Sequence, residues 1–286
     1  MPSLIDIRRR IRTVHNTQQM TKAMKMVSAA KLRRARDRAI ASRPYAEMMK
    51  RVVANVAAAA LGDVDPSELP LLSTREEKRI QLLVVSGDRG LAGAFNANLL
   101  HAAQRFIDER QGADIHVESI GRKARDYFRK SGLPTADEHI EILEKLSYKD
   151  AAGIAQRTIE LYAKGEMDAV YLIGNEFKTV MNPELAIRRI LPIEIPEGGG
   201  QNDYIYEQPA QEILSTLLPR YVEMSIYRAI LESIAAEHAA RMTAMDAATE
   251  NAGKVTQKLT LNLHRARQGA ITTEIIEIVS GAAALS

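Results

Sequence analysis

Hydrophobic positions near both ends of the chain repeat with alternating steps of three and four residues. Near the start, the set is Leu4, Ile7, Ile11, Val14, Met24 and Val27. In residues 209–285, the set of apolar or small residues is Leu217, Tyr221, Met224, Leu231, Ala235, Met242, Met245, Ala252, Leu259, Leu263, Ala266 and Ala270. This repeat is the seam of a coiled coil, so each end is predicted to be one long helix packed against another helix. A helix of about 75 residues would be roughly 110 Å long.

Several positions weaken this pattern. The polar interruptions are Thr17, Arg228, His238, Thr249 and Thr256. Pro219 is expected to break or kink the last helix, so its straight part is predicted to begin near Arg220, with 210–217 as a separate turn. Two independent amphipathic helices on a globular core are the alternative interpretation, but helices this long seldom find enough core surface.

The middle of the chain alternates between short apolar runs and helical segments. Strands are expected at 79–86, 115–120, 139–143, 169–173 and 186–195, and helices at 94–109, 122–130 and 147–164. This alternation predicts an α/β fold with a mostly parallel sheet. The predicted domains are an N-terminal coiled-coil helix (1–60), a central α/β, Rossmann-like domain (76–195) and a C-terminal coiled-coil helix (209–286).

Charge is unevenly distributed along the chain. Residues 1–51 hold fourteen Lys or Arg and only three acids, Asp6, Asp37 and Glu47, whereas the whole chain has a net charge of +3. A basic helical arm fits nucleic acid, an anionic membrane surface or an acidic protein partner. Nucleic acid is disfavoured because no aromatic residues are interleaved with the basic ones and no reading motif is present.

Composition restricts the chemistry. The chain has no cysteine, so it has neither disulfides nor thiolate metal ligands. No signal peptide and no apolar run of membrane-spanning length are found in the sequence, and a protein made in a reducing compartment is expected. The six histidines are scattered without metal-ligand spacing.

The turn after the first strand, SGDRGLAGAFN, invites a nucleotide hypothesis. Its glycines, Gly87, Gly90 and Gly93, follow a spacing that fits neither the dinucleotide fingerprint nor the Walker A motif. Asp88 and Arg89 in this turn, and Glu274 and Glu277 one helical turn apart, are better explained as solvated charges. No catalytic, cofactor or metal residue is predicted.

Three long motifs resemble the gamma subunit of bacterial F-type ATP synthases. They are IRRRIRTVHNTQQMTKAMKMVSAAKLRRAR near the start, VVSGDRGLAGAFN in the middle, and AARMTAMDAATENAG with ARQGAITTEIIEIVSGAAAL near the end. Many family members have Cys where Ala92 stands. The resemblance covers the chain from end to end.

The resemblance implies a noncatalytic rotor without a cofactor. Its terminal helices would form an antiparallel coiled coil inside a ring of three alpha and three beta subunits, and its base would rest with the epsilon subunit on the membrane ring of c subunits. Rotation would couple proton flow through that ring to ATP synthesis or hydrolysis and regulate both. The protein would lie on the cytoplasmic face of the bacterial inner membrane, attached only through the complex and without nucleic acid.

The family's contact positions carry over residue by residue. Contacts with the beta subunit are implied for Lys22, Met24, Glu237, Arg241, Arg267, Gln268 and Thr272. Contacts with epsilon and the c ring are implied for Tyr204, Tyr206 and Glu207. Two other functions stay open at this point: a coiled-coil scaffold whose basic arm binds nucleic acid, and a nucleotide-binding enzyme.

Overall fold

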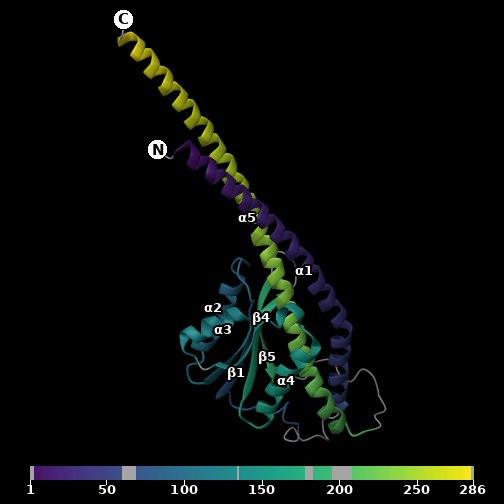
Figure 1. The fold of residues 1–286 in the computed structure, drawn as a ribbon. Helices are drawn as coiled ribbons and strands as arrows, with labels where there is room; N and C mark the ends of the chain where they lie inside the picture. Colours follow the sequence, from purple (N-terminus) through teal and green to yellow (C-terminus); the bar gives the residue numbers. More distant parts are fainter. Residues whose placement is uncertain (1–2, 60–68, 134, 178–182, 195–207, 285–286) are drawn as a thin grey trace. The chain divides into compact units, whose positions relative to one another are not determined.

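The computed structural model describes residues 3–59, 69–133, 135–177, 183–194 and 208–284. Two long helices flank the α/β segment along the chain (Figure 1), α1 at Leu4–Ala59 and α5 at Ala210–Ala284. The strands are β1 (Arg79–Val85), β2 (Asp114–Ile120), β3 (Thr135–His139), β4 (Ala169–Phe177) and β5 (Pro183–Leu191). The remaining helices are α2 (Phe95–Asp108), α3 (Arg122–Ser131), α4 (Tyr148–Ala163) and a short 3-10 turn at Leu143–Lys145.

The five strands form one sheet in the order β3-β2-β1-β4-β5. The first four run parallel, and β5 pairs antiparallel with β4. The predicted mostly parallel α/β sheet is therefore confirmed. Its edges were predicted less well: β3 lies at Thr135–His139 and not at 139–143, and β5 ends at Leu191 and not at 195. An edge strand needs no continuous apolar run, which explains why the polar β3 segment gave little signal.

Both faces of the sheet are covered. On one face, Leu82 and Val84 pack with Leu99 and Phe106 of α2 and Phe128 of α3. Figure 1 shows α4 on the side of the sheet opposite α2 and α3. On this second face, α5 packs against β4, since Gly174 lies within van der Waals reach of Ser233. Residues 229–237 of α5 are buried all the way round, as expected for a helix that crosses a domain interior.

The long helices keep their seam throughout. Every seam residue predicted in α5 is buried or half-buried. In α1, an unbroken three-and-four repeat of buried or half-buried positions runs through Leu4, Ile7, Ile11, Val14, Gln18, Thr21, Lys25, Ser28, Leu32, Ala35, Ala39, Ser42, Ala46, Met49, Val53 and Val56. Val27 was wrongly placed in this seam: it is 56% exposed, and its neighbour Ser28 takes the buried position.

The predicted break at Pro219 is also wrong, because α5 is one helix from Ala210 to Ala284. A proline inside a helix leaves the carbonyl of the residue four positions earlier without its bond. That residue, Ser215, is exposed, so water can satisfy its carbonyl. Leu214 and Leu218, each 1% exposed, are buried in the second unit, and this burial holds the first turns of α5 in place.

The chain forms two compact units. The first contains residues 1–28 and 241–286, and the second contains residues 29–240. Both long helices run through both units, so this division differs from the predicted domains 1–60, 76–195 and 209–286. Those boundaries stay a proposal.

Candidate interaction surface

In the first unit, α1 and α5 are joined by polar side chains in their seam. Lys25 forms an ion pair with Asp246 at 2.5 Å, and Thr249 donates a hydrogen bond to the hydroxyl of Thr21 at 2.7 Å. Gln18 donates to the carbonyl oxygen of Thr249 at 3.4 Å. Partner numbers on α5 rise as those on α1 fall, so the two helices pair antiparallel.

The end of α5 extends past this pairing. The antiparallel register sets the start of α1 opposite residues near Ala266 of α5. Beyond that point, large apolar side chains are 46% to 71% exposed, namely Ile271, Ile275, Ile276, Ile278 and Val279. Exposed apolar residues gathered on one element mark a surface that meets another protein. We call residues 267–280 the exposed end of α5.

The predicted contact residues of the first unit, apart from Arg241, lie at or near the surface. Arg267 and Gln268 are exposed where the pairing with α1 ends. Thr272, one turn later, is exposed and donates its hydroxyl to the carbonyl oxygen of Gln268 at 2.9 Å. On α1, Lys22 is exposed and Met24 is half-buried.

Two other predicted contact residues are buried. Glu237 is 6% exposed and Arg241 is 9% exposed. The Glu237 carboxylate covers the backbone of Gly87, where an added methyl group would lie 2.6 Å from its Oε1 atom. Tyr204, Tyr206 and Glu207 lie outside the described residues.

Part of the exposed apolar surface was not predicted from the sequence. Met20 and Met26 of α1 are 59% and 63% exposed, on either side of Lys22. Their signal was available in the sequence, because both methionines fall outside the three-and-four repeat. Most basic side chains of residues 1–51 are also exposed, and only Lys25 and Lys31 are half-buried.

The glycine-rich turn after β1 serves the fold. Asn96 accepts a hydrogen bond from the backbone N–H of Gly87 at 2.9 Å, and Asp88 accepts one from the N–H of Arg122 at 2.9 Å. Asp88 thus caps the start of α3, which explains a charge that the sequence left as solvated.

The same turn lies where doubly wound sheets bind nucleotides, at the carboxyl ends of β1 and β4. Here α5 occupies that edge: Ser233 donates to the carbonyl oxygen of Val85 at 3.2 Å, and Glu237 lies over Gly87. The usual nucleotide crevice is therefore filled by the chain's own helix. No group of three or more candidate ligands for a metal occurs among the described residues.

Further polar contacts hold α5 in the second unit. Glu232, only 6% exposed, binds Arg188 of β5 at 3.1 Å and Arg228 at 3.0 Å. The hydroxyl of Tyr148 donates to Glu223 at 2.7 Å, and burial together with this bond raises the pKa of Tyr148 to about 12. The tyrosine therefore stays neutral and keeps donating this bond at physiological pH.

Comparison with known proteins connects this architecture to one family. A family model described as ATP synthase matches residues 3–285. The ATP synthase gamma chain of Solibacter usitatus is 59% identical over 284 residues, which cover 99% of each protein. The ATP synthase gamma chain of Pelotomaculum thermopropionicum is 45% identical over 288 residues, which cover both proteins fully.

Solved structures show the same fold. A chain in the central stalk and c-ring structure of the Tetrahymena thermophila mitochondrial ATP synthase matches with a TM-score of 0.59 at 22% identity, covering 80% of this chain and 99% of that one. A chain in the Euglena gracilis mitochondrial ATP synthase, in rotational state 3, matches with a TM-score of 0.67 at 18% identity, covering 99% and 94%. At these identities the likeness bears on the fold alone.

Proposed function

Because this chain belongs to the ATP synthase gamma-chain family, we propose that it couples proton flow through a membrane c ring to ATP synthesis or hydrolysis in a ring of alpha and beta subunits. The gamma chain is a central-stalk subunit and is not catalytic by itself. Coupling would occur by rotation, with the long helices of this chain turning inside the catalytic ring.

The exposed end of α5 carries this proposal. A rotor changes the affinity of a catalytic site only if it contacts different states of that site differently. α5 is paired with α1 along one side and extends beyond it as a single helix, so its surface is asymmetric, as such a rotor requires. Its exposed isoleucines and Val279 suit an apolar bearing, because apolar contacts are not directional and do not fix one angle.

We assign the contacts with the beta subunit to two groups of exposed residues. On α5 these are Arg267, Gln268 and Thr272; on α1 they are Lys22 and the half-buried Met24. The basic surface of α1 would attract acidic loops of the partner over a distance of about one Debye length, ~8 Å at physiological salt. Such attraction does not require one fixed orientation, so it can persist while the rotor turns.

Glu237 and Arg241 would contribute to the contacts with the beta subunit from buried positions. The burial of Glu237 against Gly87 suggests that this carboxylate fixes α5 on the α/β segment, which keeps the rotor surface in place.

A second part of the chain would form the base. We propose that epsilon and the c ring contact Tyr204, Tyr206 and Glu207, on the resemblance of the segment NDYIYE alone. The ATP synthase is a membrane-associated complex, and this subunit would lie on the cytoplasmic face of the bacterial inner membrane. Among the residues that the structure describes, no helix is both long enough and apolar enough to cross a membrane.

Reconstitution with matching alpha and beta subunits tests the proposal. ATP hydrolysis is measured with and without this chain, after gel filtration shows whether the three proteins elute as one complex. We expect co-elution and faster, sustained hydrolysis in its presence. Failure of this chain to associate with alpha and beta would overturn the proposed function.

A further inference from the structure

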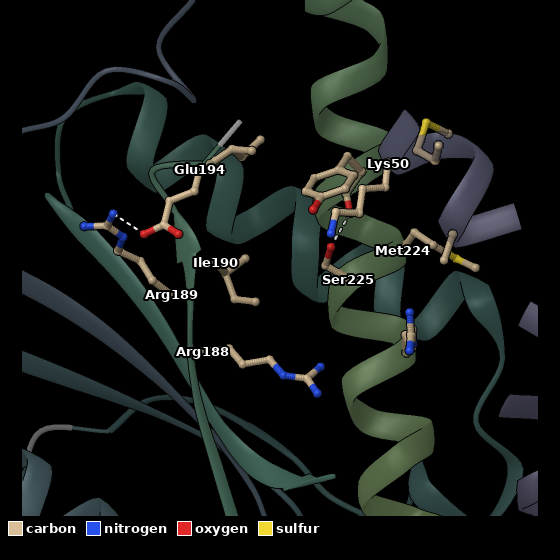
Figure 2. Close-up of a pocket in the computed structure, with 12 residues that line it drawn as sticks. Lys50, Arg188, Arg189, Ile190, Glu194, Met224 and Ser225 are labelled. Atoms are coloured by element: carbon tan, nitrogen blue, oxygen red, sulfur yellow. Dashed lines mark hydrogen bonds and ion pairs between the residues drawn. The ribbon is translucent and has the colours of Figure 1, made fainter. Parts of the chain in front are cut away.

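A cavity of about 560 Å³ lies inside the second unit, between α1, β5 and α5. Figure 2 shows side chains from all three elements around it, with Lys50 from α1, Arg188 and Ile190 from β5, and Met224 from α5. Ligand sites in proteins usually have volumes of about 300–1,000 Å³. The cavity is therefore large enough for a small molecule.

The cavity has a basic part. Among the described residues, four cationic side chains, those of Lys50, Arg188, Arg189 and Arg228, line it together with one acid, Glu194. Arg189 pairs with Glu194 and Glu77, and Arg188 pairs with Glu176 and Glu232. An anion in the cavity would therefore meet chiefly the ammonium group of Lys50 and the terminal nitrogens of Arg228.

Two of these cations are held in place by a buried carboxylate. The buried carboxylate of Glu232 binds Arg228 through Nε at 3.0 Å and Arg188 at 3.1 Å. Because Arg228 is bound through the nitrogen nearest its own chain, its two terminal nitrogens extend beyond the ion pair. A buried carboxylate that orients guanidinium groups in this way lowers the entropy lost when they bind an anion.

The cavity also has an apolar part. Met49, Ile190, Ile193 and Met224 line it, and each is less than 9% exposed. Methionine side chains are flexible and polarizable, so they adapt to a chain that lacks a fixed shape. Among the described residues of the lining, Tyr221 is the one aromatic residue, which gives little surface for stacking a nucleotide base.

From these observations we propose that the cavity binds an amphiphile with one alkyl chain and an anionic headgroup, such as a fatty acid. The headgroup would lie at Lys50 and Arg228, and the alkyl chain along the two methionines and two isoleucines. The proposal goes beyond the rotor function and does not depend on it, since the site lies within one unit of this chain.

Titration calorimetry of the full chain with laurate, below its micelle concentration, tests the proposal. We expect one binding site, with Lys50→Gln weakening the affinity about three- to tenfold through the loss of one charge near the carboxylate. Arg51→Gln is the matched control, because Arg51 is the next residue of α1, is exposed and does not line the cavity. It should leave the affinity unchanged.

A second variant fills the cavity. Ser225 lines the cavity (Figure 2), and its hydroxyl donates a hydrogen bond to the carbonyl of Tyr221 in the same helix. Because this bond lies within α5, its loss in Ser225→Leu does not disconnect α5 from another element. We expect Ser225→Leu to abolish laurate binding while the circular dichroism spectrum stays that of the wild type. If this variant does not fold, the comparison of Lys50→Gln with Arg51→Gln decides.

Three results would overturn the proposal. Dodecanol binding as tightly as laurate would show that the cations play no part. Inorganic phosphate binding as tightly as laurate would show an anion site without a pocket for a chain. Equal loss of affinity in Lys50→Gln and Arg51→Gln would show attraction to the basic surface in general.

Discussion

The hydroxyl groups of Thr21 and Thr249 lie 2.7 Å apart and join the two long helices of the first unit at the level where both seams lack an apolar residue. Thr21 also donates to the carbonyl oxygen of Gln18 at 3.0 Å, and Gln18 in turn reaches the carbonyl of Thr249. The polar positions of the two helices therefore match each other. A polar pair at one level of a coiled coil fixes the register of the helices, since a shift would break the hydrogen bond between them.

We expect Thr21→Val and Thr249→Val each to destabilise the helix pair by about 1 kcal/mol, because each removes the hydrogen bond between the two helices. The double substitution should cost less than the sum of the two single ones, since two apolar groups of the same shape replace the pair. Hydrogen exchange of the amides at 13–28 measures the local stability. Strictly additive effects would show that the two hydroxyls do not interact energetically.

The seam shows what the sequence could and could not predict. Its apolar positions, such as Ile7 and Met245, follow directly from the three-and-four repeat. Its polar positions were interpreted as interruptions, because one sequence does not show that Thr249 faces Thr21 or that Asp246 faces Lys25. These partners lie more than 200 residues apart along the chain, so only the register of the helices brings them together.

The α/β segment was predicted for a similar reason. Buried parallel strands are rich in apolar residues, so β1 and β2 were located to within one residue, whereas β4 was predicted to end at 173 and ends at Phe177. The polar edge strand β3 was misplaced. The filled crevice above Gly87 was also unpredictable, because it depends on Ser233 and Glu237 of a helix about 145 residues later.

Gly121→Ala should destabilise the second unit by on the order of 3 kcal/mol, because Gly121 has a φ of +101° and an added methyl group would lie 2.3 Å from the carbonyl oxygen of Ser86. Urea unfolding followed by circular dichroism measures the effect. Gly112→Ala is the control, since nothing lies within 4 Å of its added methyl group. Similar midpoints for both variants would show that the end of β1 can move away from Gly121.

The ion pair between Arg79 and Asp168 predicts a pH dependence. Asp168 accepts hydrogen bonds from the Arg79 side chain at 2.9 and 3.2 Å and from its N–H at 2.9 Å, and the side-chain bond is the main reason why the pKa of Asp168 is lowered. A lowered pKa in the folded state adds stability above the unfolded value of about 3.9, and this stability is lost as the pH falls through the folded pKa.

Asp168→Asn should therefore destabilise the protein at pH 7, and this effect should begin to shrink once the pH falls below about 4, relative to the wild type at the same pH. Urea unfolding at pH 7, 5 and 3.5 tests this. Asp108→Asn, which changes an exposed carboxylate on α2, is the control and should keep the wild-type pH profile. A constant difference between Asp168→Asn and wild type at all three pH values would exclude the ion pair as its source.

Gln268→Leu should slow coupled turnover of the assembled complex roughly three- to tenfold, the size expected when a partner contact of about 1 kcal/mol is lost in the rate-limiting step. Gln268 is exposed where α5 leaves its pairing with α1, so the substitution should not affect folding of the chain. Gln257→Leu makes the same change at another exposed position of α5 and serves as the control. ATP synthesis and hydrolysis are measured in reconstituted vesicles together with the amount of assembled complex. Unchanged rates in Gln268→Leu at equal assembly would remove this residue from the proposed contact with the beta subunit, whereas equal slowing in both variants would indicate a general effect of apolar substitution on α5.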